Sequence, residues 1–347
     1  MTLSNPAPLA SSWSGRRRLT WQRSYAAALI AVVLLVLDIV FSGGTFSSIQ
    51  ALGITNDALP LALAGIGETL VILTNGIDLS VGGIITLANV TVAVLSQHGL
   101  GEEGIIAAIA LGAAAGLVNG LIVSYARIAP LIATLATSSI FVGVALIILP
   151  LPGGTVPGWL PGWASGSLGF LPVSVIWLAL SLVAGWLLLH RTRFGVNLQA
   201  LGGSEPSALS AGIGVVRVRA LAYTFSGVFS ALAGVVLAGL TQSGDPTIGA
   251  PYLLDTIATV VIGGTSLVGG VGTIVGTVLG AVVLSLVSAV LLASGLSTYI
   301  QYFVSGGIVV GALLVQTQMY RLKVKGSARR RHLGLDAAGR SAGRSAG

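Results

Sequence analysis

Two carboxyl groups stand among residues that are otherwise mostly apolar. Glu68 lies inside an apolar run, and Asp78 follows it in the stretch "LTNGIDLSVGG", residues 73–83. At the depth of a membrane an Asp costs roughly 2.5–3.5 kcal/mol on insertion scales, so such a group must face protein, water or an interface. Two interpretations of Glu68 stay open: a proton- or ion-coupling group, or a structural hydrogen bond to a neighbouring helix.

Neutral polar residues gather around Asp78. Gly76 can end one helix, and Asp78 or Ser80 can cap the start of the next, so the stretch predicts a tight break between two helices. A helix cap alone does not account for the other polar side chains nearby. The candidates for lining a hydrated route are therefore Glu68, Asn75, Asp78, Ser80, Asn89, Asn119 and Thr134.

The motifs of soluble and membrane enzymes are missing from the sequence. It has no H-E-x-x-H zinc motif and no G-x-x-x-x-G-K-[ST] phosphate loop, and its only lysines are Lys323 and Lys325. The three histidines are scattered, and the absence of cysteine excludes disulfides and thiolate metal sites. We therefore predict no catalytic residue, no metal site and no ATP hydrolysis by this chain.

The elements that position these residues are expected to be membrane helices. The chain of 347 residues is 54% hydrophobic and 8% charged, against about 25% charged in a typical soluble domain. At about 20 residues per crossing, the sequence predicts an all-α polytopic membrane protein with about ten transmembrane helices in a domain over 25–320. The expected spans are 25–41, 58–75, 79–97, 104–124, 129–150, 171–190, 214–240, 253–269, 271–293 and 299–317, and the stretch "IGGTSLVGGVG" is also compatible with a re-entrant bend.

The charges predict the orientation of these spans. All 17 Lys and Arg residues fall on the side of the N-terminus, in the segment 1–24, at Arg127, in the 191–219 loop and in the tail 321–347, which we expect to be disordered. Cytoplasmic loops carry such an excess, so both termini are predicted to be inside. This confinement of charge to termini and loops argues against nucleic-acid binding. The opposite loops hold the acids Asp57, Glu102, Glu103 and Asp245.

Two stripes of glycine have the spacing used in close packing of membrane helices. One lies in the span 104–124 and the other in the span 271–293, each with glycines four residues apart. Small residues at this spacing let helix backbones approach closely. The predicted packing residues are Gly112, Gly116 and Gly120 in the first stripe, and Gly272, Gly276 and Gly280 in the second.

Four stretches in order resemble a known family. They are "ILTNGIDLSVGG" (72–83), "NGLIVSYARIAPLIATLATSSIFVGVALI" (119–147), the segment 191–234 that begins "RTRFGVNLQALGG", and "LLDTIATVVIGGTSLVGGVGTIVGTVLGA" (253–281). Together they resemble the membrane permease subunits of sugar ABC importers of the ribose, xylose and galactose type, over about residues 50–316. Permeases for branched-chain amino acids or nucleosides share this build, but "GIDLSVG" favours the sugar branch.

The resemblance implies an architecture with several partners. It implies two permease chains, identical or paralogous, that form a passage in the bacterial inner membrane. It also implies cytoplasmic ATPase subunits that hold ATP and Mg²⁺, and an extracytoplasmic solute-binding protein. This chain would need no cofactor of its own. The acids Asp57, Glu102, Glu103 and Asp245 become candidates for docking the binding protein, although they can also merely reflect the exclusion of cations from outer loops.

The 191–219 loop becomes the candidate for coupling to the ATPase. Ser204, Glu205 and Pro206 form a helix start, with a capping serine followed by an acid and a proline in the first turn. In the family the matching loop carries a coupling helix, whereas a helix lying on lipid headgroups is the alternative. The coupling residues implied are Arg191, Arg193, Gly202, Gly203, Ser204, Glu205, Pro206, Arg217 and Arg219.

Another class of transporter stays open at this point. A proton- or sodium-coupled secondary transporter of a small solute would work without an ATPase and would use Glu68 and Asp78 in transport. The solute is also open, since pentoses, hexoses, polyols and furanose-like molecules are all compatible with the resemblance.

Overall fold

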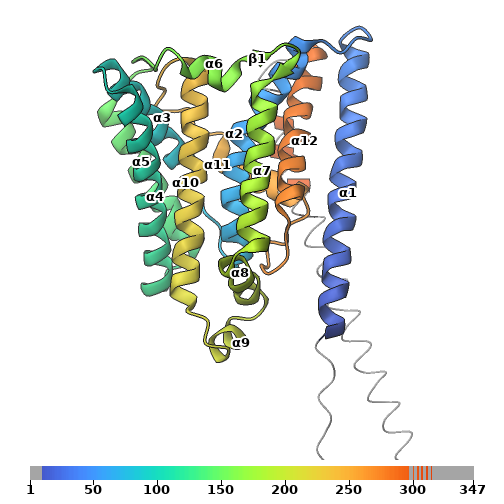
Figure 1. The fold of residues 1–347 in the computed structure, drawn as a ribbon, viewed down its shortest axis with the longest axis vertical. Coiled ribbons are helices and arrows are strands. Elements are labelled where there is room, and N and C mark those ends of the chain that lie inside the picture. Colours follow the sequence, from blue (N-terminus) through green and yellow to red (C-terminus); the bar gives the residue numbers. More distant parts are fainter. Residues whose placement is uncertain are drawn as a thin grey trace, which may run out of the picture.

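The chain folds into a bundle of helices that run roughly parallel to one axis (Figure 1). The computed structural model describes residues 10–296, with side chains from residue 25, and isolated positions between 300 and 314. The long helices are α1 (Ala10–Phe41), α2 (Ser48–Leu73), α3 (Val81–Gln97), α4 (Gly101–Tyr125), α5 (Pro130–Ile148), α7 (Val173–Arg191), α10 (Val215–Thr241) and α12 (Ile274–Ala293). The shorter ones are α6 (Leu160–Ser165), α8 (Arg193–Gly203), α9 (Glu205–Ser210) and α11 (Tyr252–Ile262).

The two ends of the bundle carry different elements. At one end, α6 is followed by a two-stranded antiparallel ribbon of β1 (Ser167–Leu168) and β2 (Leu171–Pro172). At the other end, α8 and α9 lie below the long helices, and the start of α1 lies at that same end (Figure 1). These two ends of the bundle are called the α6 end and the α9 end from here on.

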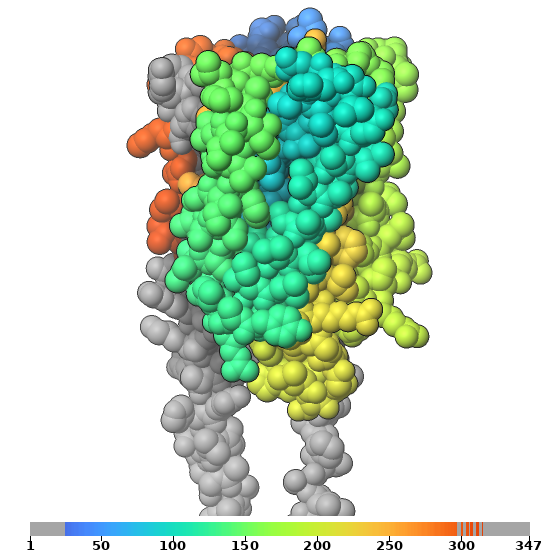
Figure 2. Space-filling model, turned by 90° about the vertical axis from the view of Figure 1, so that its left-hand side faces the viewer, coloured from blue at the N-terminus to red at the C-terminus, as the bar shows by residue number. Residues whose placement is uncertain are grey.

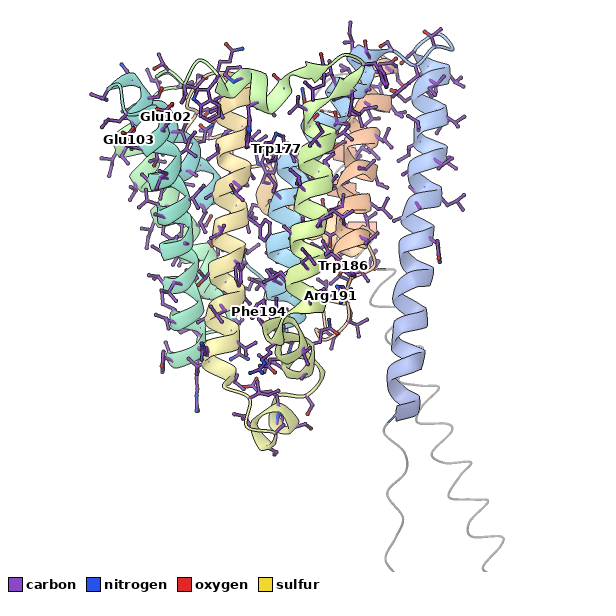
Figure 3. All side chains as sticks on the ribbon, in the orientation of Figure 1. Glu102, Glu103, Trp177, Trp186, Arg191 and Phe194 are labelled. Carbon is purple, nitrogen blue, oxygen red and sulfur yellow. The ribbon has the colours of Figure 1, made fainter. Side chains whose placement is uncertain are left out.

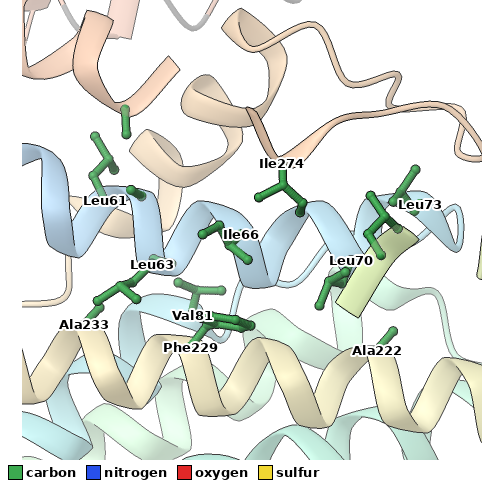
Figure 4. Packing of buried hydrophobic residues seen from close by; sticks show 14 of the residues in the cluster. Leu61, Leu63, Ile66, Leu70, Leu73, Val81, Ala222, Phe229, Ala233 and Ile274 are labelled. Carbon is green, nitrogen blue, oxygen red and sulfur yellow. The ribbon is translucent and has the colours of Figure 1, made fainter. Parts of the chain in front are cut away.

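The core of the bundle is built around α2 and α10. In α2, 89% of the 18-residue apolar stretch is buried, because α7, α8, α10, α11 and α12 all pack against this helix. Leu63, Ile66 and Leu70 of α2 face Phe229 and Ala233 of α10 and other apolar residues across this contact (Figure 4). A helix that is apolar on all sides is a buried one. The protein is therefore solid around its central helix.

The outer helices present apolar side chains to the surroundings. The apolar stretch of α5 is only 22% buried, and the apolar stretch of α4 is 33% buried. These two helices form much of the face shown in Figure 2, above the yellow region around α9 and the start of α10. On α5 the apolar side chains of Ile132, Ile140 and Ile147 are exposed, and such a surface is unfavourable in water. This face therefore suits contact with lipid or with another apolar protein surface.

The structure supports a polytopic membrane fold. Within the described residues, six helices are long and apolar enough to cross a membrane, and α3, α11 and the part of α1 from Tyr25 are shorter apolar helices. The spans predicted at 79–97, 104–124, 129–150, 171–190 and 214–240 agree with α3, α4, α5, α7 and α10 to within about three residues. The helical backbone of α1 also includes residues 10–24 of the predicted N-terminal segment. Most of the span 299–317 and all of the tail 321–347 lie outside the described residues.

The prediction for the start of α2 was wrong. The helix begins at Ser48 and not near residue 58, because Ser47 and Gln50 form a capping box. Ser47 Oγ accepts a bond from the Gln50 N–H at 3.2 Å, and the Gln50 side chain accepts one from the Ser47 N–H at 2.8 Å. Asp57 therefore lies within α2 and not in a loop, which weakens its case as a docking residue.

The prediction for the span 253–269 was also wrong in its length. Helix α11 stops at Ile262 after 11 residues, about 16 Å at 1.5 Å per residue, against a hydrocarbon core of about 30 Å. Gly264, Gly269 and Gly270 have φ between 71° and 88°, which breaks the helix and makes residues 263–273 an irregular turn. Gly272 lies in this turn, outside α12, so the second glycine stripe is not a single helix face.

Candidate functional site

The break between α2 and α3 is tied into the interior by the side chain of Asp78. Its Oδ1 accepts bonds from the backbone N–H and the hydroxyl of Ser80, at 3.0 and 2.5 Å. Its Oδ2 accepts a bond from the Ser226 hydroxyl of α10 at 2.9 Å. The backbone N–H of Asp78 in turn donates to Glu68 Oε1 of α2 at 3.2 Å. Asp78 thus links the break to two helices, to α10 through its carboxylate and to α2 through its backbone N–H.

The outer helices join the same network. Asn119 of α4 donates from Nδ2 to Ser80 Oγ at 2.7 Å. Thr134 of α5 accepts a bond from the Leu79 N–H at 2.9 Å and donates toward backbone carbonyls, including that of Pro130 at 2.8 Å. The seven residues from Thr74 to Ser80 are therefore held by side chains from α2, α4, α5 and α10. This connected set is called the Asp78 network below.

Three buried polar atoms beside this network have no hydrogen-bond partner. They are Glu68 Oε2, Asn119 Oδ1 and the Tyr223 hydroxyl, which lies close to Gly76. Among the described residues no Lys or Arg forms an ion pair with Glu68 or Asp78. Burying a polar group without a hydrogen-bond partner costs free energy, so these three atoms destabilise the fold locally.

Asn89 belongs to a second, separate set of bonds on α3. Its Oδ1 accepts a bond from the Asp245 N–H at 2.7 Å, and Thr86 Oγ1 accepts one from the Gly249 N–H at 3.1 Å. These contacts hold the 242–251 loop against α3 at the α6 end. Asp245 itself is half-buried, and its Oδ1 accepts two bonds from Thr247.

The predicted path residues do not line an open route in this single-chain conformation. Glu68, Asp78, Ser80, Asn89, Asn119 and Thr134 are all at most 1% exposed and are surrounded by protein. Asn75 is exposed, and it takes the left-handed conformation (φ 65°) that ends α2, a position predicted for Gly76. Of the predicted path residues, the Asp78 network contains Glu68, Asp78, Ser80, Asn119 and Thr134 but neither Asn75 nor Asn89. The sequence analysis missed Ser226 and Tyr223, because their helix α10 is distant in sequence and gives no motif.

The 191–214 segment forms the extension at the α9 end. Thr192 caps α8, and Ser204 caps α9 with Glu205 and Pro206 in its first turn, the arrangement that the sequence predicts. Glu205 pairs with Arg219 of α10 at 2.9 Å, which ties the start of α9 to the bundle. Phe194 of α8 packs on Phe225 of α10 with ring centres 5.3 Å apart. The extension is therefore braced against α10.

A junction of glycines connects this extension to the end of α2. A Cβ on Gly202 of α8 would overlap the Leu73 carbonyl and the Gly270 nitrogen. The Gly270 N–H donates to the Leu73 carbonyl at 3.1 Å, and a Cβ on Gly269 would lie 3.0 Å from the Asn75 nitrogen. The end of α8, the end of α2 and the 263–273 turn thus meet backbone to backbone. We call this contact the glycine junction.

The first glycine stripe packs α4 against α10. A Cβ on Gly112 would lie 2.5 Å from Ala231 Cβ, and one on Gly120 would lie 2.6 Å from Ala220 Cα. A Cβ on Gly116 would overlap the Tyr223 carbonyl. In the second stripe, Gly280 meets the backbone of Thr259 in α11 and Gly276 that of Gly263 directly after it, whereas Gly272 contacts the Thr265 side chain.

The α6 end carries acids and tryptophans. Glu102 and Glu103 are exposed in the first turn of α4, at the end opposite Arg191 and Phe194 (Figure 3). Glu102 Oε1 accepts a bond from Trp159 Nε1 at 3.1 Å, and Trp163 packs against Trp177 in a tilted arrangement with ring centres 3.9 Å apart. Tryptophan is typical of membrane interfaces.

Comparison with known proteins identifies the family. Residues 50–313 match the family described as "Branched-chain amino acid transport system / permease component". The chain belongs to this family. The permease is 40% identical over 293 residues to the ribose import permease protein RbsC of Bacillus subtilis (strain 168), covering 81% of this chain and 90% of that relative.

Other relatives match over most of their length. The permease is 36% identical to RbsC of Escherichia coli (strain K12) over 316 residues, 88% of this chain and 98% of the relative. It is 33% identical to the galactose/methyl galactoside import permease protein MglC of Salmonella typhimurium over 328 residues, 88% and 97% of the two chains. No solved structure matches it. These matches confirm the resemblance drawn from the four sequence stretches, and the chain is a transport permease and not an enzyme.

Proposed function

We propose that this chain forms the membrane passage of an ATP-driven, binding-protein-dependent importer for a monosaccharide or a related small polar solute in the bacterial inner membrane. The observation that carries the proposal is the identity of 36–40% with ribose import permeases over at least 81% of the chain. The galactose/methyl galactoside relative widens the solute class beyond pentoses.

The α9 end is the proposed site of the ATPase subunits. Helix α9 stands clear of the bundle (Figure 1). Arg217, in the first turn of α10, is exposed. Arg219 is half-buried and paired with Glu205, so its proposed part in coupling is to hold the start of α9 against α10. Leu209 is exposed on α9, so docking combines apolar contact with the charge of Arg217.

The glycine junction supports a route for coupling. Motion of α9 would pass through α8 to Gly202, and from there to the end of α2 and the 263–273 turn, because their backbones are in direct contact. Beyond that contact lies the break held by the Asp78 network. The path residues are therefore proposed to shape the passage by holding this break, and not by direct contact with solute.

The α6 end is the proposed docking surface of the solute-binding protein. Glu102 and Glu103 are exposed there and can pair with basic residues of a partner, which favours steering and orientation. Asp245 is half-buried and bonded within its own loop, and Asp57 lies in α2, so both contribute less.

The passage itself is proposed to lie between two permease chains, identical or paralogous. Around α2 the interior is filled by packed side chains, whereas α4 and α5 expose apolar surface that a second chain or lipid can cover. Two chains side by side would create a route that one packed chain lacks.

The test is uptake by proteoliposomes that contain the permease with its ATPase and binding protein. Uptake of labelled ribose or galactose is expected only with ATP inside and with the binding protein present. In the same assay Glu68→Gln should keep uptake near the wild-type level, because the amide oxygen accepts the same bond from the Asp78 N–H. Uptake by the permease alone, driven by a proton or sodium gradient and abolished by Glu68→Gln, would instead establish a secondary transporter.

A further inference from the structure

A basic hollow lies at the elbow between α7 and α8, away from the Asp78 network. It has a volume of about 360 Å³ and is lined by His190, Arg191, Thr192, Arg193, Val196 and Asn197. His190, Arg191 and Arg193 are exposed there. Three nitrogen-bearing side chains and an amide thus surround one open space, a composition that suits an anionic oxygen ligand.

The positive charge of this hollow is not neutralised within the protein. The ion pair between Arg219 and Glu205 is the one that occurs in the described part of the chain, and neither Arg191 nor Arg193 has an acidic partner there. An anion placed between two such guanidinium groups would be attracted by both. The hollow therefore carries a net positive charge that no acidic side chain of the described residues balances.

The position of the hollow along α7 indicates which kind of anion would bind there. Leu180, Val183 and Leu187 of α7 are exposed and apolar, and the hollow begins directly below them. Between the two lies Trp186, which stacks on His190 with ring centres 5.5 Å apart. The guanidinium carbon of Arg191 also lies 5.5 Å from the centre of the Trp186 ring (Figure 3). A tryptophan followed by arginines marks the headgroup depth of a membrane.

We propose that this hollow binds the phosphate group of an anionic phospholipid. Arg193 and the partly Trp-stacked Arg191 would hold the phosphate oxygens, Asn197 would donate to the headgroup, and the acyl chains would run along the exposed face of α7. The site goes beyond the proposed transport function, since lipid binding can occur whether or not the chain imports a sugar. It also assigns Arg191 and Arg193 to lipid, whereas the sequence implied contact with the ATPase.

Lipid at this place would act on the extension at the α9 end. The bound headgroup would fix the first turn of α8, whose last turn forms the glycine junction and leads into α9. An importer with this site should therefore couple ATP hydrolysis to uptake better in membranes that contain anionic lipid.

The test measures lipid affinity of the purified full-length chain by native mass spectrometry. Phosphatidylglycerol should bind more tightly than phosphatidylcholine. The double variant Arg191→Gln, Arg193→Gln should lose roughly 30-fold of that affinity, since each basic residue near an anionic surface contributes on the order of fivefold. The matched control Arg217→Gln, which removes an exposed arginine at the same end, should bind like the wild type. The pair Arg191→Lys, Arg193→Lys should retain most of the affinity.

A second measurement places the lipid even where a variant folds poorly. Phosphatidylglycerol with brominated acyl chains should quench tryptophan fluorescence of the wild type, and Trp186→Phe should remove that part of the quenching. Equal phosphatidylglycerol affinity in the double Gln variant, or unchanged quenching in Trp186→Phe, would overturn the proposal. Displacement of phosphatidylglycerol by inorganic phosphate would also overturn it, because the site would then serve a free anion.

Discussion

At the scale of single residues, Asp78 is an acceptor in the protein interior. Three donors converge on its carboxylate, the Ser80 N–H, the Ser80 hydroxyl and the Ser226 hydroxyl. The residue types alone predicted a polar cluster at this break. They did not predict that the cluster is buried, because burial depends on α10, which is about 150 residues away in sequence.

Replacing Asp78 tests whether these bonds hold the break. Asp78→Ala leaves three buried donors without their acceptor, the Ser80 N–H and the hydroxyls of Ser80 and Ser226. At about 1–3 kcal/mol per unsatisfied group, this should destabilise the fold by at least about 3 kcal/mol. We expect a lower Tm in detergent and reduced uptake. Asp78→Asn should be milder, since its remaining oxygen still accepts from Ser80. The control is Ser139→Ala on the exposed face of α5. A wild-type Tm and normal uptake in Asp78→Ala would mean that the network contributes nothing.

At the scale of helices, glycines decide how closely two elements approach. Gly116 of α4 faces the Tyr223 carbonyl of α10, so any side chain there must push the helices apart. Gly116→Ala should cost about 1–3 kcal/mol of stability through overpacking. Gly143→Ala on α5 is the matched control, because nothing lies within 4 Å of its new methyl group. Thermal unfolding of both variants decides the matter: equal Tm values would show that α4 and α10 do not need this close contact.

The glycine junction has a distinct signature in coupling. Gly202→Ala should separate α8 from the end of α2, because its methyl group would overlap the Leu73 carbonyl. In proteoliposomes we expect ATP hydrolysis to continue while uptake per ATP falls several-fold. Gly214→Ala at the other end of the α9 segment has a φ of −72° and only Arg217 Cβ nearby at 3.8 Å, so it should behave like the wild type. An unchanged uptake-to-hydrolysis ratio in Gly202→Ala would exclude this route.

The sequence predicted helices better than it predicted their interruptions. Apolar runs located α4, α5, α7 and α10, since each of these helices is long and apolar enough to cross a membrane. The sequence did contain a signal for the early start of α2, the capping box of Ser47 and Gln50. This cap starts the helix even though residues 48–57 are more polar than the rest of α2. The early end of α11 was harder, because one glycine-rich stretch can be a packed helix or a turn, and only its contacts with α2 and α8 decide between them.

At the scale of the whole molecule, charge separates along the bundle axis. Arg191 lies at the α9 end, whereas Glu102 and Glu103 lie at the α6 end (Figure 3). The other described arginines from Arg127 onward follow the last residue of α4 or belong to α8 and the start of α10, which places them at the α9 end too. The sequence predicted this separation from loop charges alone. It did not predict the solid interior, since a list of spans says nothing of which helix is central. The proposals for the ATPase and the binding protein both require the α9 end to be cytoplasmic.

Cysteine labelling tests this orientation directly, because the chain has no cysteine of its own. Glu103→Cys and Ser210→Cys each place one thiol at an exposed position, at the α6 end and the α9 end. A membrane-impermeant maleimide should label Glu103→Cys in spheroplasts and Ser210→Cys only in inside-out vesicles, since positive charge favours the cytoplasmic side. Ala62→Cys, fully buried in α2, should stay unlabelled in both. Labelling of Ser210→Cys from the outside would reverse the orientation and remove the physical basis for ATPase docking at α9.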